Sequence, residues 1–240
     1  MRKSSTHKIL RVSDGRREQA RRAVVTEYPL LLRVNGCNLA TLVCSPHDLN
    51  YLLAGFFRLQ GFVTSLDEIQ VMGICTEFGL AEVRLRGELP ERLQLTLTSG
   101  CGSGIDYNLS PDLIASSQQR NRCYGSEGLL RLMKDLQGLA AQYREHGGIH
   151  SAAIGDDDGV LIYAEDIGRH NTLDRLSGEA LFRQIDLQDK MLVTSGRVST
   201  EMVAKAVRLG IGLIASRTSP TDKAIELCEQ AGITLVGYLR

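Results

Sequence analysis

The sequence has no excess of charge of either sign, and it has no long hydrophobic run. Lys+Arg and Asp+Glu both total 28, so net charge gives no reason to expect a nucleic-acid or membrane partner. No apolar run approaches the roughly 18 residues that a membrane-spanning helix needs. The 240 residues, 43% hydrophobic and 23% charged, are typical of a globular protein with one large domain or two small ones.

The spacing of a disulfide framework and of a metal site is also lacking. The cysteines form no CxxC pair and no His/Cys cluster with zinc spacing, so we expect no protein-ligated metal. Nothing marks the chain as secreted, and a chain of this length does not need disulfides for stability. We therefore expect a cytoplasmic protein with free thiols at Cys37, Cys44, Cys75, Cys101, Cys123 and Cys228.

The first 22 residues carry a concentration of basic side chains. No hydrophobic stretch follows them, as a signal peptide would require. Charge runs at chain termini are usually solvated, so we expect residues 1–22 to form a solvated or frayed arm. Its basic residues are Arg2, Lys3, Lys8, Arg11, Arg16, Arg17, Arg21 and Arg22.

Residues 23–125 are predicted to form a smaller α+β domain with an antiparallel sheet. Its first two strands are expected to join at an Asn35-Gly36 turn. A helix is expected from Ser45 to Gln60, with Ser45 as its cap and Pro46 in its first turn. A glycine-rich segment, residues 99–104, then leads to a domain boundary. The expected strands are residues 24–36, 39–44, 68–75, 80–86 and 93–98.

Residues 126–240 are predicted to form an α/β domain with the order αββαβαβαβ. Strands that are joined by helices should be parallel, with both faces of the sheet covered. Apolar periodicity and turn signals place the helices at residues 129–143, 171–184, 199–209 and 219–232. The expected strands are residues 151–154, 160–165, 191–195, 211–216 and 233–239.

Four of these strands end in segments that contain arginine. In open α/β sheets ligands bind beyond the carboxyl ends of the strands, near helix N-termini. Guanidinium groups and free backbone N–H groups suit phosphate oxygens, so the sequence predicts a site for a phosphate-bearing ligand at this edge. The candidates from these segments are Arg169, His170, Asn171, Ser195, Gly196, Arg197, Arg217 and Arg240.

Two alternatives remain open at this edge. The arginines could instead pair with Glu165, Asp166 and Glu201, or they could lie in water. His170 could be a structural histidine rather than a contact to phosphate or nucleobase.

Cys101 alone among the cysteines has a glycine on each side. Glycines permit an exposed, mobile thiol and leave backbone N–H groups free to stabilise a thiolate. A glycine-rich linker could also carry a cysteine by accident. No general base is identifiable nearby in the sequence, so a cysteine hydrolase has little support.

Several segments together resemble the formate dehydrogenase accessory proteins of the FdhD/NarQ family. The resemblance runs from about Glu27 to Arg240, and EDIGRHNTLDR and SGRVSTEMV are its most specific motifs. The other matching segments are EYPLLLRVNG, LLAGFFRLQGFV, GGIHSAAI and SPTDKAIELCEQAGITLVGYLR.

The resemblance implies a sulfur carrier with sulfurtransferase-type activity. Such a protein takes sulfur from a cysteine desulfurase as a persulfide, which falls on Cys101 here. It passes the sulfur to the bis-molybdopterin guanine dinucleotide molybdenum cofactor, which is then inserted into the formate dehydrogenase apoprotein. The resemblance also implies a homodimer, a three-layer α/β/α cytidine-deaminase-like fold for residues 126–240, and cofactor contacts at Tyr238, Leu239 and Arg240.

One departure from the family bears on mechanism. The family pattern CGxCG is CGSGI here, so the second cysteine is absent, either replaced by Gly104 or deleted. A second thiol could resolve the persulfide or relay its sulfur. The alternative function is therefore a cofactor-binding maturation chaperone without sulfur transfer. A zinc deaminase is rejected, because the two helix starts that should hold the HxE and PCxxC ligands read GRHN and GRVST.

Overall fold

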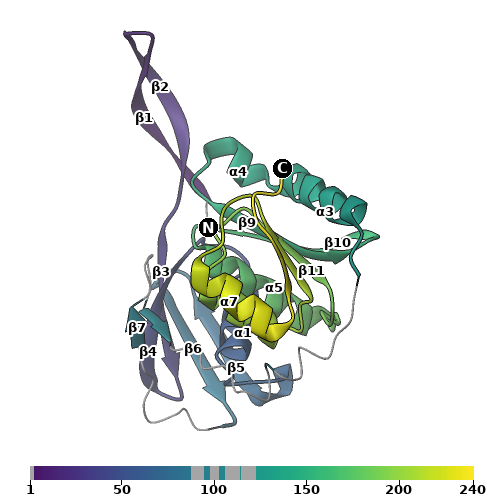
Figure 1. Cartoon of the computed structure of the whole chain (residues 1–240). Helices are drawn as coiled ribbons and strands as arrows, with labels where there is room; N and C mark the ends of the chain where they lie inside the picture. The colour runs from purple at the N-terminus through teal and green to yellow at the C-terminus, as the bar shows by residue number, and fades with distance from the viewer. Residues whose placement is uncertain (1–2, 88–94, 98–102, 106–113, 115–122) are drawn as a thin grey trace.

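The computed structural model describes residues 3–87, 95–97, 103–105, 114 and 123–240. A hairpin arm precedes a four-stranded sheet, and a five-stranded sheet with helices on its faces completes the chain (Figure 1). Among the described residues, none of the helices has the length and apolar character needed to cross a membrane.

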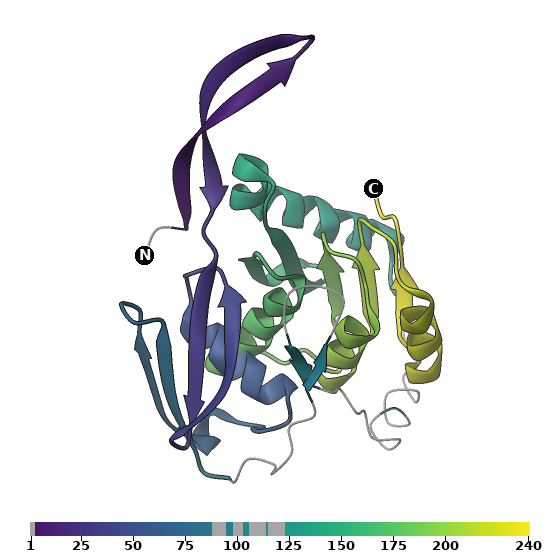
Figure 2. The ribbon, with the colours of Figure 1, turned by 90° about the vertical axis from the view of Figure 1, so that its left-hand side faces the viewer.

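The arm consists of β1 (Ser4–Ser13) and β2 (Arg16–Val25), paired antiparallel along their whole length. Asp14 and Gly15, with φ of 51° and 75°, form the two-residue turn between them. The arm stands away from the body in two perpendicular views (Figures 1 and 2). It is solvated, as expected, but it is a hairpin and not a frayed segment.

The next sheet has the strand order β4-β3-β6-β5. The expected turn is confirmed, since Asn35 and Gly36 have φ of 49° and 83° between β3 and β4. The prediction of an antiparallel sheet is wrong in one pair, because β3 and β6 are parallel. Each hairpin is antiparallel within itself, and the two hairpins meet through like-directed inner strands. The strands are β3 (Tyr28–Val34), β4 (Cys37–Cys44), β5 (Ile69–Cys75) and β6 (Leu80–Leu85).

Helix α1 (Leu49–Leu59) begins three residues later than predicted. Its N-cap is Asp48, which has a left-handed φ of 42°, and Ser45 is not the cap. Ser45 is bound elsewhere: its N–H donates to Asp166 and its hydroxyl accepts from Ile167 N–H. The apolar face of α1 is buried with the sheet in one hydrophobic cluster.

A short 3₁₀ helix, η1 (Leu66–Glu68), precedes β5. Two further short strands, β7 (Leu95–Leu97) and β8 (Ser103–Ile105), pair antiparallel. Gly104 pairs with Thr96 in this small sheet. Cys101 lies outside the described residues, in the sequence between these two strands.

The C-terminal sheet has the strand order β10-β9-β11-β12-β13. Helix α3 covers one face, while α5, α6 and α7 cover the other, so the expected three-layer α/β/α arrangement is confirmed. The strands are β9 (His150–Asp156), β10 (Gly159–Asp166), β11 (Met191–Thr194), β12 (Leu213–Ser216) and β13 (Thr234–Val236). The helices are α3 (Ser126–Leu139), α4 (Ala141–His146), α5 (Arg169–Arg183), α6 (Thr200–Arg208) and α7 (Asp222–Ala231).

The single helix predicted for residues 129–143 is two helices. Ala140, with ψ of 66°, leaves the helical conformation between α3 and α4. The Glu165 carboxylate accepts hydrogen bonds from Gln142 N–H and Tyr143 N–H, at 3.2 and 3.0 Å. These donors belong to the first turn of α4, where an anion is favoured by the helix dipole. The break therefore places a new helix N-terminus over the end of β10.

Helices α1 and α5 cross closely, and this contact joins the two sheets. A Cβ on Gly55 would lie 1.6 Å from the Asp174 carbonyl oxygen, and one on Gly178 would lie 1.9 Å from the Tyr51 carbonyl oxygen. Both clashes are with backbone, which a rotamer change cannot relieve. Glycine at both positions is what allows the helices to approach so closely.

We expect Gly55→Ala and Gly178→Ala each to lower the free energy of unfolding by at least about 3 kcal/mol, at the upper end of overpacking effects. Gly138→Ala is the matched control, because Gly138 is also helical but has open space around it. That change should be neutral or stabilising by up to about 1 kcal/mol. Urea unfolding followed by circular dichroism measures all three. Equal effects at the three sites would contradict the close crossing.

Candidate functional site

The carboxyl ends of four strands meet at one edge of the C-terminal sheet. Strand β9 is antiparallel to both β10 and β11, so these two run in the same direction. Strands β11, β12 and β13 are parallel to one another. The strand directions on which the predicted phosphate site depends are therefore confirmed. Arg169, Arg197 and Arg217 follow β10, β11 and β12 at this edge.

Gly196 allows the segments after β10 and β11 to lie side by side. A Cβ at this position would be 2.9 Å from Cβ of Arg169 and 3.4 Å from Nδ1 of His150. His150 begins β9, whose direction places its first residue at the same edge. The structure thus brings Arg169, Gly196 and His150 together.

Hydroxyl hydrogen bonds join the β11 exit to the β12 exit. The Ser216 hydroxyl donates to the Gly196 carbonyl at 2.7 Å and accepts from Thr218 N–H at 3.0 Å. The C-terminal segment is bound beside them, because Tyr238 N–H donates to the Thr218 carbonyl and Leu239 N–H to the Ser216 carbonyl. The β11 exit, the β12 exit and the last residues are therefore hydrogen-bonded to one another, and the β10 exit lies against them at Gly196. We call this edge the rim.

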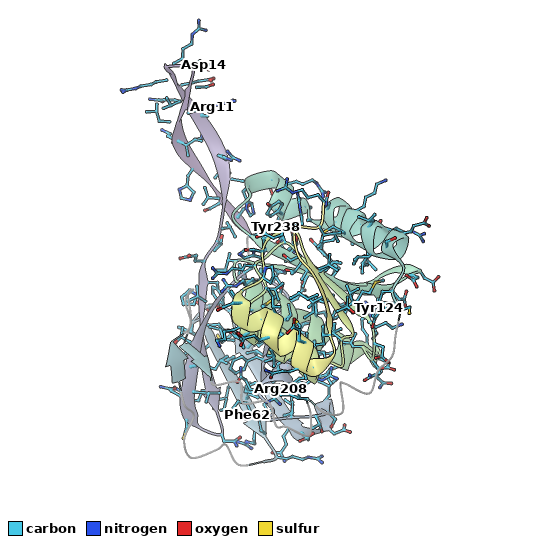
Figure 3. The ribbon with its side chains drawn as sticks, viewed as in Figure 1. Arg11, Asp14, Phe62, Tyr124, Arg208 and Tyr238 are labelled. Carbon is cyan, nitrogen blue, oxygen red and sulfur yellow. The ribbon has the colours of Figure 1, made fainter. Side chains whose placement is uncertain are left out.

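The last residues differ from the prediction in one respect. Strand β13 ends at Val236, three residues earlier than expected, and Tyr238 has a left-handed φ of 57°. Its side chain is 63% exposed on the outer surface at this edge (Figure 3). Leu239 packs against the hydrophobic cluster of α3, whereas Arg240 is exposed. The backbone bonds of Tyr238 and Leu239 bend the chain out of the sheet before Arg240.

The carboxylates that could have paired with the arginines are bound to other groups. Glu165 accepts from the first turn of α4, and Asp166 pairs with Arg175 at 2.7 Å. Glu201 lies 3.3 Å from Nδ1 of His170 and 3.8 Å from Nζ of Lys205. Within the part of the chain that the structure describes, Arg197 and Arg217 form no ion pair, and both are exposed. Their charges are available to a ligand.

Asp166 and Arg175 also bind the N-terminal half of the chain to this edge. Arg175 donates to the carbonyls of Ser45, His47 and Asp48, and Asp166 accepts from Ser45 N–H at 3.1 Å. Asp166 further accepts from Asn171 Nδ2 at 2.8 Å, so the predicted site residue Asn171 has a structural partner. Both charged side chains are almost fully buried, and their charges and hydrogen bonds are mutually satisfied.

A small cavity of about 160 Å³ lies between the α3–α4 break and the rim. Ser195 and Arg217, both predicted from the sequence, line it. Tyr143, Arg144 and Ser151 line it as well, although sequence reasoning did not predict them. The positions of Tyr143 and Arg144 depend on the break at Ala140, which helical periodicity could not reveal. The antiparallel direction of β9 could have indicated Ser151 and His150.

His170 is held as a neutral ring. Its side chain is 15% exposed. Burial lowers its pKa far below the ordinary value, and the positive charges of Lys205 and Arg169 act in the same direction. The Glu201 carboxylate opposes this effect, but Glu201 is shared with Lys205. We conclude that burial and the surrounding cations prevail. Neither ring nitrogen makes a hydrogen bond within the described residues.

The charge beneath His170 is fixed by a buried ion pair. Nζ of Lys205 lies 2.8 and 2.9 Å from the two carboxylate oxygens of Asp174. Burial raises the pKa of Asp174 to about 6, although Lys205 acts to lower it. Lys205 also donates to the His170 carbonyl at 3.4 Å. Through this bond the ion pair is connected to the first turn of α5, which contains His170.

The neutral His170 makes stability depend on pH. Below its ordinary pKa the unfolded ring binds a proton that the folded ring does not, so acidification from pH 7 to 5 lowers the free energy of unfolding. We expect wild type to lose about 1–2 kcal/mol more than His170→Gln over this range. Asp174, whose raised pKa acts in the opposite sense, is present in both proteins. Urea unfolding at each pH measures the difference, and imidazole ¹⁵N shifts report the protonation state. Equal losses in both proteins would contradict a neutral ring.

A profile of the FdhD/NarQ family matches residues 25–240. The sulfur carrier protein FdhD of Staphylococcus haemolyticus is 35% identical over 237 residues, covering 97% of this chain and 90% of the relative. FdhD of Staphylococcus aureus strain Newman is 36% identical, covering 97% and 89%. A crystal structure described as a candidate formate dehydrogenase accessory protein from Desulfotalea psychrophila has the same fold. Its TM-score is 0.78 at 24% identity, covering 99% of this chain and 93% of that one. The chain therefore belongs to the FdhD/NarQ family.

Proposed function

We propose that the protein is a sulfur carrier that serves the maturation of formate dehydrogenase. The names of its relatives support this role. The arginines at the rim are the observation that supports the substrate proposed next. The substrate is the bis-molybdopterin guanine dinucleotide molybdenum cofactor, which brings two pyrophosphate groups. The partners are a cysteine desulfurase, which supplies sulfur, and the formate dehydrogenase apoprotein, which receives the cofactor. The carrier acts as a homodimer in the cytoplasm.

The charge of the rim supports a pyrophosphate ligand. Arg197 and Arg217 are exposed. Arg169, which follows β10, packs against Gly196, which directly precedes Arg197. Charge-assisted hydrogen bonds from guanidinium groups to phosphate are short and often bidentate. The first turns of α5 and α6 begin beside these arginines and add the positive ends of two helix dipoles. Arg240 and Tyr238 extend the same rim at the chain end.

Ser195 supplies a neutral contact at this rim, and the neutral His170 ring lies buried behind it. A neutral imidazole can donate one hydrogen bond and accept another, so in this proposal a nucleobase edge or a ribose hydroxyl binds the ring nitrogens once the side chains that cover them move. The Ser195 hydroxyl already accepts from Ser151 N–H at 2.9 Å, and this bond leaves its proton free to donate. We assign phosphate binding to the arginines and orientation of the nucleoside to these neutral groups.

Cys101 carries the sulfur in this proposal. Its thiolate attacks the outer sulfur of the desulfurase persulfide, forming a new S–S bond while the desulfurase thiolate leaves. In the delivery step the S–S bond breaks and its electron pair stays on Cys101, which regenerates the thiolate. The transferred sulfur is then at the zero-valent level, so the step requires a cofactor in a reduced state, which would supply the two electrons that convert it to a sulfido ligand. The cycle needs one cysteine, which agrees with glycine at position 104. No second thiol is then required to release the sulfur.

The persulfide is tested by intact mass spectrometry after incubation with a cysteine desulfurase and cysteine. Wild type should gain the mass of one sulfur atom, and dithiothreitol should remove it. Cys101→Ala should gain none, whereas Cys75→Ala, which removes an exposed cysteine elsewhere, should behave as wild type. The carrier role fails if Cys101→Ala is labelled as fully as wild type.

Guanine nucleotide binding tests the rim separately. We expect isothermal titration with GDP to show at least a tenfold loss of affinity in Arg197→Ala and in Arg217→Ala. That loss corresponds to about 1.5–3 kcal/mol for a charged hydrogen bond. Arg183→Ala is the control, because Arg183 pairs with Glu179 on the outer side of α5. An equal loss in the control would indicate a nonspecific charge effect.

A maturation chaperone without sulfur transfer is the alternative function. It is favoured by one observation, the absence of the second family cysteine. The two functions predict different outcomes in formate dehydrogenase maturation. Cys101→Ala abolishes maturation by a carrier and spares maturation by a chaperone, whereas Arg197→Ala impairs both.

A further inference from the structure

The N-terminal arm concentrates positive charge that the rest of the chain lacks. Residues 1–25 contain eight Lys and Arg against two Asp and Glu, a formal charge of +6. Because the whole chain sums to zero, residues 26–240 carry −6. Within the described chain the arm forms no ion pair with the body, and its tip, with Arg11 and Asp14, lies far from it (Figure 3). The two opposite charges are therefore separated in a single copy.

The two faces of the arm differ in composition. Residues that pair directly across an antiparallel hairpin share a face, and successive residues alternate between faces. One face, which we call the cationic face, carries Lys8 opposite Arg21, Leu10 opposite Gln19, and Val12 opposite Arg17. It has three cations and no acid. The other face carries His7 opposite Arg22, Arg11 opposite Glu18, and Ser13 opposite Arg16. It also has three cations, but one of them lies opposite an acid, and its apolar pair, Ile9 and Ala20, is partly buried.

The cationic face exposes apolar side chains and opposed like charges, as expected of a surface that binds a partner. Leu10 and Val12 are 57% and 63% exposed. Lys8 and Arg21 are directly opposite each other, an arrangement of like charges that destabilises an isolated hairpin. A two-stranded hairpin is itself only marginally stable in water. A partner surface with acids around an apolar centre would bury Leu10 and Val12 and would neutralise the repulsion between Lys8 and Arg21.

Helix α7 offers such a surface. Asp222, Ile225, Glu226 and Glu229 recur at helical spacing on one face, and all four are exposed. Ile225 is 43% exposed between the acids, and Lys223 on the same helix pairs with Glu226 at 3.2 Å. Seven residues of helix span about 10 Å, and the four residues from Lys8 to Val12 span about 13 Å of strand, so the two surfaces match in length.

We propose that the arm of one copy docks through its cationic face on the acidic face of α7 in a second copy. Leu10 and Val12 cover Ile225, while Lys8, Arg17 and Arg21 meet Asp222, Glu226 and Glu229. The exchange pairs the +6 arm with a −6 body. It also assigns a site of contact to the homodimer, independent of sulfur transfer.

Sedimentation equilibrium of the full chain tests the docking. Wild type should form a dimer that weakens as salt rises, because exposed ion pairs are screened. Arg17→Glu/Arg21→Glu should weaken dimerisation at least tenfold. Arg16→Glu/Arg22→Glu, with the same change in net charge on the opposite face, should stay within about twofold of wild type. Since Arg21→Glu places an acid opposite Lys8, the arm variant keeps its hairpin, which circular dichroism can verify.

Charge exchange between copies tests the acceptor surface. Asp222→Arg/Glu226→Arg should also prevent dimerisation alone, and an equal mixture with Arg17→Glu/Arg21→Glu should form a 1:1 heterodimer. A monomeric wild type overturns the proposal, as does a dimer that is equally affected by both arm variants or a mixture that stays monomeric. Tight binding of a single-stranded RNA probe to the arm without self-association would also overturn it, because it would show a nucleic-acid partner instead.

Discussion

The buried ion pair between Asp166 and Arg175 is the interaction on which the other parts of the structure depend. It binds the turn that begins at Ser45 to the end of β10, and so fixes the N-terminal sheet to the edge that carries the candidate site. The tight crossing of α1 and α5 at Gly55 and Gly178 acts beside it. Breaking a buried pair by removing one partner typically costs about 3–5 kcal/mol, more than most surface contacts contribute.

The same region distributes charge between structural and functional roles. The acids near the rim bind other groups. Asp166 pairs with Arg175, Glu165 accepts from the first turn of α4, and Glu201 lies near Lys205. Arg197 and Arg217 consequently face solvent with their charge unneutralised by any described acid. A neutral His170 among these cations adds no further repulsion. The two exposed guanidinium groups are the part of this arrangement that the proposed anionic substrate would bind.

Much of this could be predicted from the sequence, for a physical reason. Short periodic segments and turn residues fix local structure, and parallel strands bring their carboxyl ends together, so the positions of Arg169, Arg197 and Arg217 followed from strand order alone. The failures involve distant partners. Ser45 has the residue type of a helix cap, but it is held instead by a hydrogen bond to Asp166, which lies 121 positions away in the sequence. Ala140 has high helix propensity, yet Glu165 binds the N–H groups just beyond it and ends the helix there. Single-sequence reasoning has no access to such contacts.

The separation in sequence between Arg175 and Ser45 has a consequence for synthesis on the ribosome. Arg175 donates to a carbonyl 130 positions earlier in the chain, so the N-terminal sheet and α1 emerge well before their partner does. Domains generally fold as they are made, N-terminal part first. The face of α1 that receives α5 therefore stays uncovered until the second half is translated. A nascent chain of this protein therefore exposes an apolar helix surface, marked by Gly55, for about half of its elongation.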